Sequence, residues 1–254
     1  MEFTDYFLLS TARLQKRRYL GLLGFWFRVP ELPFADEKDI AAFADANATE
    51  LLITTNVVVF LSRWLLYGND PWSWRKHFTV SVSGVSRRPW SMVLAAFAQE
   101  DTEHLLSNVF TLASVGPLSV AILGGGRTLA LYAAGGVAGS AAALFYHWLT
   151  DRRAVACLGA SGAIYALMGF CFSAVPGAQM ALLGRSVPAI QALLLNVAKD
   201  ALMSARTRVD FAGHLGGLAL GAALAQSSWW MGRSSRLLSW GAGSGSIPSA
   251  LWWW

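Results

Sequence analysis

The stretch LGASGAIYALMGF, from Leu158 to Phe170, places a serine between small residues at the start of an apolar run. Gly159 and Gly162 let a second backbone come close to Ser161, and small residues of this kind are typical of interfaces between membrane helices. The apolar residues that follow would be accepted by lipid. Taken alone, the stretch fits a serine that packs helices together, so a functional interpretation depends on the rest of the chain.

The whole chain is poor in charge. Of its 254 residues, 55% are hydrophobic and 14% are charged, and the mean hydropathy is +0.43, whereas soluble domains carry about 25% charged residues. The Lys and Arg residues behind the net charge of +5 stand in short flanks between apolar runs, so no nucleic-acid-binding face is predicted. Composition therefore predicts a membrane protein with the lipid bilayer as a partner.

Apolar runs recur at a spacing close to the about 20 residues that cross a bilayer. Six spans are predicted, at Leu51–Leu66, His104–Leu123, Thr128–Leu149, Ala156–Val175, Ala178–Met203 and Phe211–Gln226. The fifth is the weakest, because Gly184 and Pro188 interrupt it. The predicted fold class is an all-α membrane bundle. Basic residues flank both sides, so the positive-inside rule leaves its orientation open.

Three regions are expected along the chain: an N-terminal part at 1–50, a membrane domain at 51–226 and a Ser- and Gly-rich tail at 227–254. Residues 6–30 contain basic but no acidic side chains, which fits an organelle transit peptide. The aromatic residues of Leu20–Phe27 equally fit an interfacial helix. Residues 31–50 are expected to form a solvated linker, and the aromatic-rich segment Tyr67–Glu103 is expected at head-group depth.

Polar side chains within spans are costly and are therefore candidates for function. His104 and Asn108 are four residues apart and would share a helix face. Glycines around His214 would let its helix approach that of Ser161, where the imidazole could take the proton of the serine. Tyr165 lies one turn after Ser161 and could stack on that imidazole. Each residue also has a plainer interpretation, as a helix-interface or core residue.

The segments GASGAIYALMGF, HLLSN at His104–Asn108 and GHLGG at Gly213–Gly217 together resemble the signature segments of the rhomboid intramembrane serine proteases. The similarity extends over roughly residues 75–226. It implies a six-helix core in which Ser161 is the nucleophile and His214 the general base, a dyad without a third acid. It also implies an oxyanion site made by His104, Asn108 and the Ser161 backbone N–H.

The same resemblance implies that Gly159 shapes the turn before the serine and that Tyr165 stacks on His214. It makes the long first loop interfacial and the polar fifth segment a gate for a substrate helix. The expected partners are therefore transmembrane-helix proteins as substrates, with no cofactor and no metal. Hydrolysis needs water, so we expect a polar cavity lined by Ser161, His214, His104 and Asn108.

At two positions the sequence departs from the family pattern, and these departures put the anchoring of the first loop in doubt. Ser91 follows Trp90 where the family often has arginine, and Gln99 stands where it often has histidine. RKHFTVS from Arg75 and DFAGHLGG from Asp210 look closest to the mitochondrial, presenilin-associated rhomboid-like branch. With the acid-free N-terminal region, this favours the mitochondrial inner membrane over another organelle or the plasma membrane.

Other sites and functions are weighed against this one. Asp210 precedes His214 by four residues, but an Asp at a helix entrance is commonly a cap. Cys157 and Cys171 would lie about 21 Å apart on one helix, too far for a disulfide.

A catalytically inactive rhomboid-like protein that binds or escorts membrane helices would be expected to lack the serine or the histidine. A transporter would show internal symmetry, and none is evident. Substrate and oligomeric state stay open.

Overall fold

In the computed structural model, the described residues are 19–22, 25–28, 37–68, 70–175, 178–182, 185–203 and 210–227. The chain divides into two compact units, Met1–Ala42 and Phe43–Trp254. In the first unit, β1 (Tyr19–Leu22) pairs antiparallel with β2 (Phe25–Arg28). The interfacial helix predicted for Leu20–Phe27 is therefore wrong where the residues are described. The rest of residues 6–30 lies outside the described residues, as does the tail beyond 227.

The stretch expected to be a solvated linker up to residue 50 is helical from Glu37 onward, and its residues 47–49 are buried. Helix α2 (Glu37–Leu65) contains one break, at Asn47, where φ is −133° and ψ is 20°. Ala48 and Thr49 are buried. Thr49 fills the space that Gly116 leaves by having no Cβ, so this part of the chain packs against a neighbouring helix.

In the described part of the chain, three helices are long and apolar enough to cross a bilayer: the Ala46–Leu65 part of α2, α5 (Thr102–Leu123) and α6 (Gly125–Leu149). Two shorter apolar helices follow, α7 (Ser161–Ala174) and α9 (Phe211–Ala225). The helical membrane fold is thus confirmed among the described residues, whereas the count of six spans stays a prediction.

The predicted fourth span, Ala156–Val175, becomes helical only at Ser161. Before it, Cys157 pairs with Val80 through backbone hydrogen bonds of 2.8 and 2.9 Å, and Gly159 has a φ of +138°. This pairing competes with helix formation and delays the start of α7. Ser161 consequently becomes the first residue of its helix.

The predicted fifth span is helical only in its second half. β3 (Gln179–Leu182) and β4 (Arg185–Pro188) form an antiparallel pair, and α8 (Ala189–Met203) begins directly after Pro188. A proline removes a backbone donor and obstructs the preceding helical turn. The helix predicted for Ala178–Pro188 is therefore wrong.

The long first loop is folded and anchored without the arginine of the family pattern. It contains α3 (Pro71–Phe78), α4 (Ser91–Leu94) and a short 3₁₀ helix, η1 (Ala95–Phe97). Trp74 is buried and its Nε1 donates to Ser62 Oγ of α2 at 3.4 Å. Arg63 of α2 donates to the Glu100 carbonyl at 2.8 Å. The loop is thus tied to α2 at both ends.

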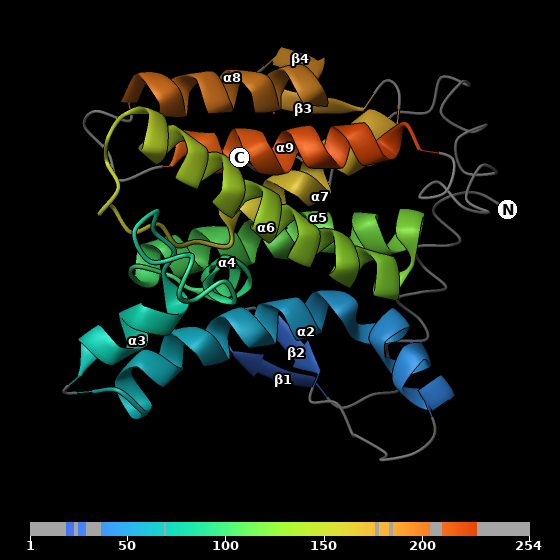
Figure 1. The fold of residues 1–254 in the computed structure, drawn as a ribbon. Coiled ribbons are helices and arrows are strands. Elements are labelled where there is room, and N and C mark those ends of the chain that lie inside the picture. The colour runs from blue at the N-terminus through green and yellow to red at the C-terminus, as the bar shows by residue number, and fades with distance from the viewer. Residues whose placement is uncertain are drawn as a thin grey trace, which may run out of the picture. The chain divides into compact units, whose positions relative to one another are not determined.

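Helices α6, α7 and α9 pack closely, and α8 lies along α9 (Figure 1). The contact between α7 and α9 depends on glycine, because a Cβ on Gly217 would collide with the Gly162 carbonyl oxygen. A Cβ on Gly221 would likewise collide with the Ala166 carbonyl oxygen. This close approach brings the start of α9 next to the start of α7.

Candidate active site

Ser161 lies at the N-terminus of α7, two residues after a glycine with positive φ. Gly159 has φ +138°, a conformation that side-chain-bearing residues rarely adopt, and its N–H donates to the Ala95 carbonyl at 2.9 Å. The space left by its missing Cβ is bordered by the His104 ring, whose Cε1 lies 3.1 Å from the Cβ position, and by Ser161 Oγ at 3.5 Å. Gly159 thus has a backbone conformation suited to a turn, and its missing Cβ lets these two side chains border one space.

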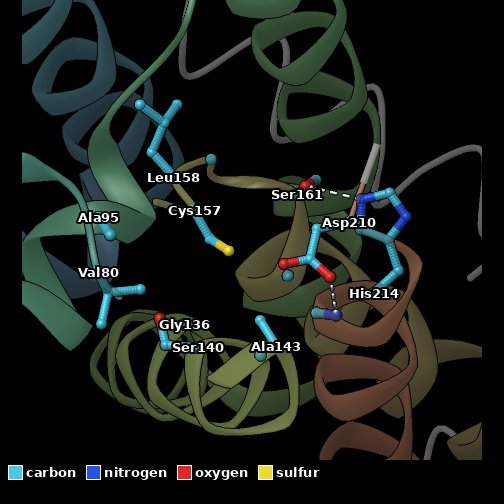
Figure 2. A pocket seen from close by; sticks show the side chains of 14 residues that line it. Val80, Ala95, Gly136, Ser140, Ala143, Cys157, Leu158, Ser161, Asp210 and His214 are labelled. Atoms are coloured by element: carbon cyan, nitrogen blue, oxygen red, sulfur yellow. Dashed lines mark hydrogen bonds between the residues drawn. The ribbon is translucent and has the colours of Figure 1, made fainter. Parts of the chain in front are cut away.

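His214 comes from the first turns of α9 and is only 9% exposed. Its Nε2 lies 2.8 Å from Ser161 Oγ (Figure 2). The Tyr165 ring stacks on the imidazole, with centroids 4.4 Å apart and planes inclined by 7°. The structure thus brings together the three residues that the sequence analysis grouped around one reaction centre.

The other ring nitrogen of His214 faces an acid that the sequence analysis did not single out. Nδ1 lies 3.0 Å from Oδ2 of Asp200 on α8. In the sequence, Asp200 can be recognised as a charged residue in a largely apolar segment, and charged residues within membrane segments are candidates for function. Asp210 instead caps α9, since its Oδ1 accepts from the Gly213 N–H at 3.2 Å. The capping interpretation of Asp210 is therefore confirmed.

His104 lies in the first turn of α5, where its backbone N–H is capped by Asp101 Oδ1 at 2.8 Å. Its Nδ1 accepts from the Glu100 N–H at 3.4 Å. A neutral imidazole that accepts at Nδ1 carries its proton on Nε2. Nε2, which borders the Gly159 space at 3.3 Å, is thus a hydrogen-bond donor.

Asn108 is buried, and its amide is held by a chain of hydrogen bonds. Asn108 Nδ2 donates to Gln99 Oε1 at 2.8 Å, and Gln99 Nε2 donates to Asn56 Oδ1 at 2.8 Å. Asn56 donates to the Tyr132 hydroxyl at 3.0 Å, and that hydroxyl donates to the Ala96 carbonyl at 2.8 Å. The chain ties α2, α5, α6 and the first loop together. One N–H of Asn108 Nδ2 remains for another acceptor.

A cavity of about 40 Å³ lies beside Ser161 and His214. A water molecule needs roughly 10–15 Å³ by this measure, so the cavity has room for a few. Cys157, Asp210 and Ser140 also line it, as Figure 2 shows. His104 and Asn108 are not among its described lining residues, contrary to expectation. His104 Nδ1 faces the Glu100 N–H and Asn108 Nδ2 donates to Gln99, while His104 Nε2 borders the Gly159 space on the other side of the ring.

In the part of the chain that the structure describes, one group of side chains has ligand atoms close enough for a metal ion. These atoms belong to His147, Cys157 and Asp210 and lie within 4.8 Å of one another. His147 Nε2 lies 3.9 Å from Asp210 Oδ2, so this proximity also fits an ordinary polar contact between the two side chains.

Comparisons with known proteins identify the family. A family model described as the rhomboid domain matches residues 86–230. Over 184 residues the chain is 34% identical to "Rhomboid protein 1, mitochondrial" of Saccharomyces cerevisiae, which covers 69% of this chain and 51% of the relative. The chain thus spans about half the length of that relative. The resemblance seen in the three motifs is confirmed, and this integral membrane protein belongs to the rhomboid family.

Proposed function

We propose that this protein is an intramembrane serine endopeptidase that hydrolyses peptide bonds in or near the transmembrane helices of other membrane proteins. The observation that carries the proposal is the 2.8 Å contact between Ser161 Oγ and His214 Nε2 at the edge of a small cavity. A serine hydroxyl is a poor nucleophile until a base takes its proton, and imidazole suits that task near neutral pH.

In this mechanism, His214 Nε2 accepts the hydroxyl proton while Ser161 Oγ attacks the carbonyl carbon of the scissile bond. The proton then passes from Nε2 to the leaving amine, and an acyl-enzyme remains on Ser161. A water molecule from the cavity gives a proton to Nε2 and attacks the acyl carbon. Nε2 then returns that proton to Ser161 Oγ as the bond between Oγ and the acyl carbon breaks, which releases the second product as a carboxylic acid and restores the serine. Tyr165 keeps the imidazole plane in place through both steps, because its ring stacks on that plane.

Negative charge develops on the carbonyl oxygen in both steps and needs donors. The first backbone N–H groups of a helix have no acceptor within it, and Ser161 is the first residue of α7. We assign the oxyanion to the Ser161 N–H, His104 Nε2–H and the second amide N–H of Asn108. A donor of this kind typically contributes about 3 kcal/mol to transition-state stabilisation.

The proposed substrates are membrane proteins whose helices reach Ser161 from the bilayer. The yeast relative carries the word mitochondrial in its name, and this supports a mitochondrial membrane, the inner membrane in our proposal, as the location of the protein.

An activity-based fluorophosphonate probe tests the role of Ser161, because it reacts with an activated serine. We expect the wild type in detergent to be labelled and Ser161→Ala to remain unlabelled, with His214→Ala about as severely impaired. Ser140→Ala is the matched control, because its hydroxyl lines the same cavity but donates to the Met92 carbonyl; it should label like the wild type. Equal labelling of Ser161→Ala and the wild type would remove Ser161 from the role.

A further inference from the structure

A buried carboxylate contacts the imidazole on the edge opposite the serine. His214 Nδ1 and Asp200 Oδ2 are 3.0 Å apart, and their side chains are 11% and 13% exposed. The second oxygen, Oδ1, faces the exposed ammonium group of Lys199 at 3.7 Å. The two carboxylate oxygens thus have separate partners, which leaves Oδ2 for the imidazole.

This contact fixes which nitrogen of His214 carries the proton. A carboxylate accepts but does not donate, so Nδ1 must hold the hydrogen and Nε2 must present its lone pair to Ser161. When the serine proton moves to Nε2, the resulting imidazolium lies next to a negative charge. The Tyr165 ring covers one face of the imidazole and orients the plane, but stacking does not select a tautomer.

The position of Asp200 depends on how α8 is seated. Leu193 and Val197 of α8 pack on Leu218 of α9, with Tyr165 and Met168 of α7 against the same cluster. Asp200 follows Val197 by three residues and Leu193 by seven, so it continues the same face of the helix. The apolar stripe that holds α8 beside α9 (Figure 1) therefore also directs the carboxylate to His214.

We propose that Asp200 is a positioning residue that fixes the tautomer of His214 and stabilises its protonated form, so that the site works as a serine–histidine–aspartate arrangement. The proposal rests on the proposed protease function and departs from the dyad implied by the family resemblance. Because the acid is carried by α8, catalytic competence depends on α8 being seated against α9.

Two substitutions and a control test this role in the full-length protein. Asp200→Asn keeps the shape of the side chain but can donate to Nδ1, which favours the wrong tautomer. We expect its rate of fluorophosphonate labelling to fall about ten- to a hundredfold, less than in a soluble triad because Tyr165 still orients the ring. For cleavage of a transmembrane substrate, kcat should fall by the same factor with KM nearly unchanged.

Asp200→Glu should recover part of the labelling rate, since it restores a carboxylate. Asp151→Asn is the charge-matched control, because the Asp151 side chain is 89% exposed and pairs with Arg153 on the surface; it should behave like the wild type. Thermal unfolding of each variant separates a loss of chemistry from a loss of fold.

The imidazole ¹⁵N chemical shifts of His214 in the wild type give a readout that needs no variant. We expect a protonated Nδ1 and an unprotonated Nε2 in the resting protein, and the opposite tautomer would overturn the proposal. It would also be overturned if Asp200→Asn labelled at the wild-type rate, even if cleavage fell, because Asp200 would then act in substrate entry. Labelling of Ser161→Ala would instead refute the protease function itself.

Discussion

Gln99 is fully buried, with 0% exposure, and stands where the family pattern often has a histidine. Its amide accepts from Asn108 and donates to Asn56, so it satisfies one polar group on each side. An amide can do both at once because it carries a donor and an acceptor. The departure from the family pattern therefore leaves Asn108, the proposed oxyanion donor, anchored.

Replacing Gln99 with leucine tests this anchoring. Gln99→Leu leaves buried polar groups of Asn56 and Asn108 without partners, so we expect the free energy of unfolding to fall by about 1–3 kcal/mol. We also expect kcat for cleavage to fall about tenfold, since a misdirected oxyanion donor stabilises the transition state less well. Denaturant unfolding and steady-state cleavage measure the two effects. Gln226→Leu, on an exposed residue, is the control, and wild-type behaviour of Gln99→Leu would contradict the anchoring role.

The central residues of the site could be predicted from sequence because spacing within helices limits their positions. Tyr165 follows Ser161 by one turn, and glycines flank His214, so their meeting required only that two helices pack closely. Asp200 could not be predicted in the same way. Its contact with His214 depends on where α8 begins, which the pairing of β3 with β4 decides.

At the scale of elements, glycine spacing on α9 decides how near His214 comes to Ser161. Gly217 and Gly221 face backbone carbonyls of α7, and a carbonyl within a helix cannot move without displacing the helix. Gly213 is different, because the nearest atom to its Cβ position is 3.6 Å away. The three glycines of one run therefore have unequal roles.

Alanine substitutions along this run measure the difference. We expect Gly217→Ala and Gly221→Ala each to lower the free energy of unfolding by about 1–3 kcal/mol, the usual range for overpacking. Gly213→Ala adds a methyl group in ordinary van der Waals contact and should leave the unfolding free energy unchanged or slightly higher, since alanine favours helix. Unfolding of all three variants in one detergent provides the measurement. A similar loss of unfolding free energy at all three positions would show that the close contact between α7 and α9 is not the cause of the loss.

Hydropathy predicted most of these helices, because lipid-compatible runs must satisfy their backbone groups internally. It failed where tertiary pairing competes with helix formation. The Val80 to Cys157 pairing delays α7, and the β3–β4 pairing replaces half of the fifth predicted span. The delayed start of α7 lies at the candidate active site, because it makes Ser161 the first residue of the helix.

At the scale of the whole molecule, the rhomboid domain match over residues 86–230 includes His104, Asn108, Ser161 and His214. The polar groups of the site belong to α5, α7, α8 and α9. Hydrolysis at such a site requires that substrate helices come from the bilayer and water from a cavity. The activity should therefore appear only toward membrane-embedded segments.

Cleavage of a panel of single-span helices by the purified protein in liposomes tests the central claim most directly. We predict that the wild type cuts at least one helix of the panel within or next to its apolar segment, and that Ser161→Ala and His214→Ala cut none. Cleavage by Ser161→Ala at the wild-type rate, or no cleavage of any helix by a folded wild type that also fails to react with the fluorophosphonate probe, would contradict the account.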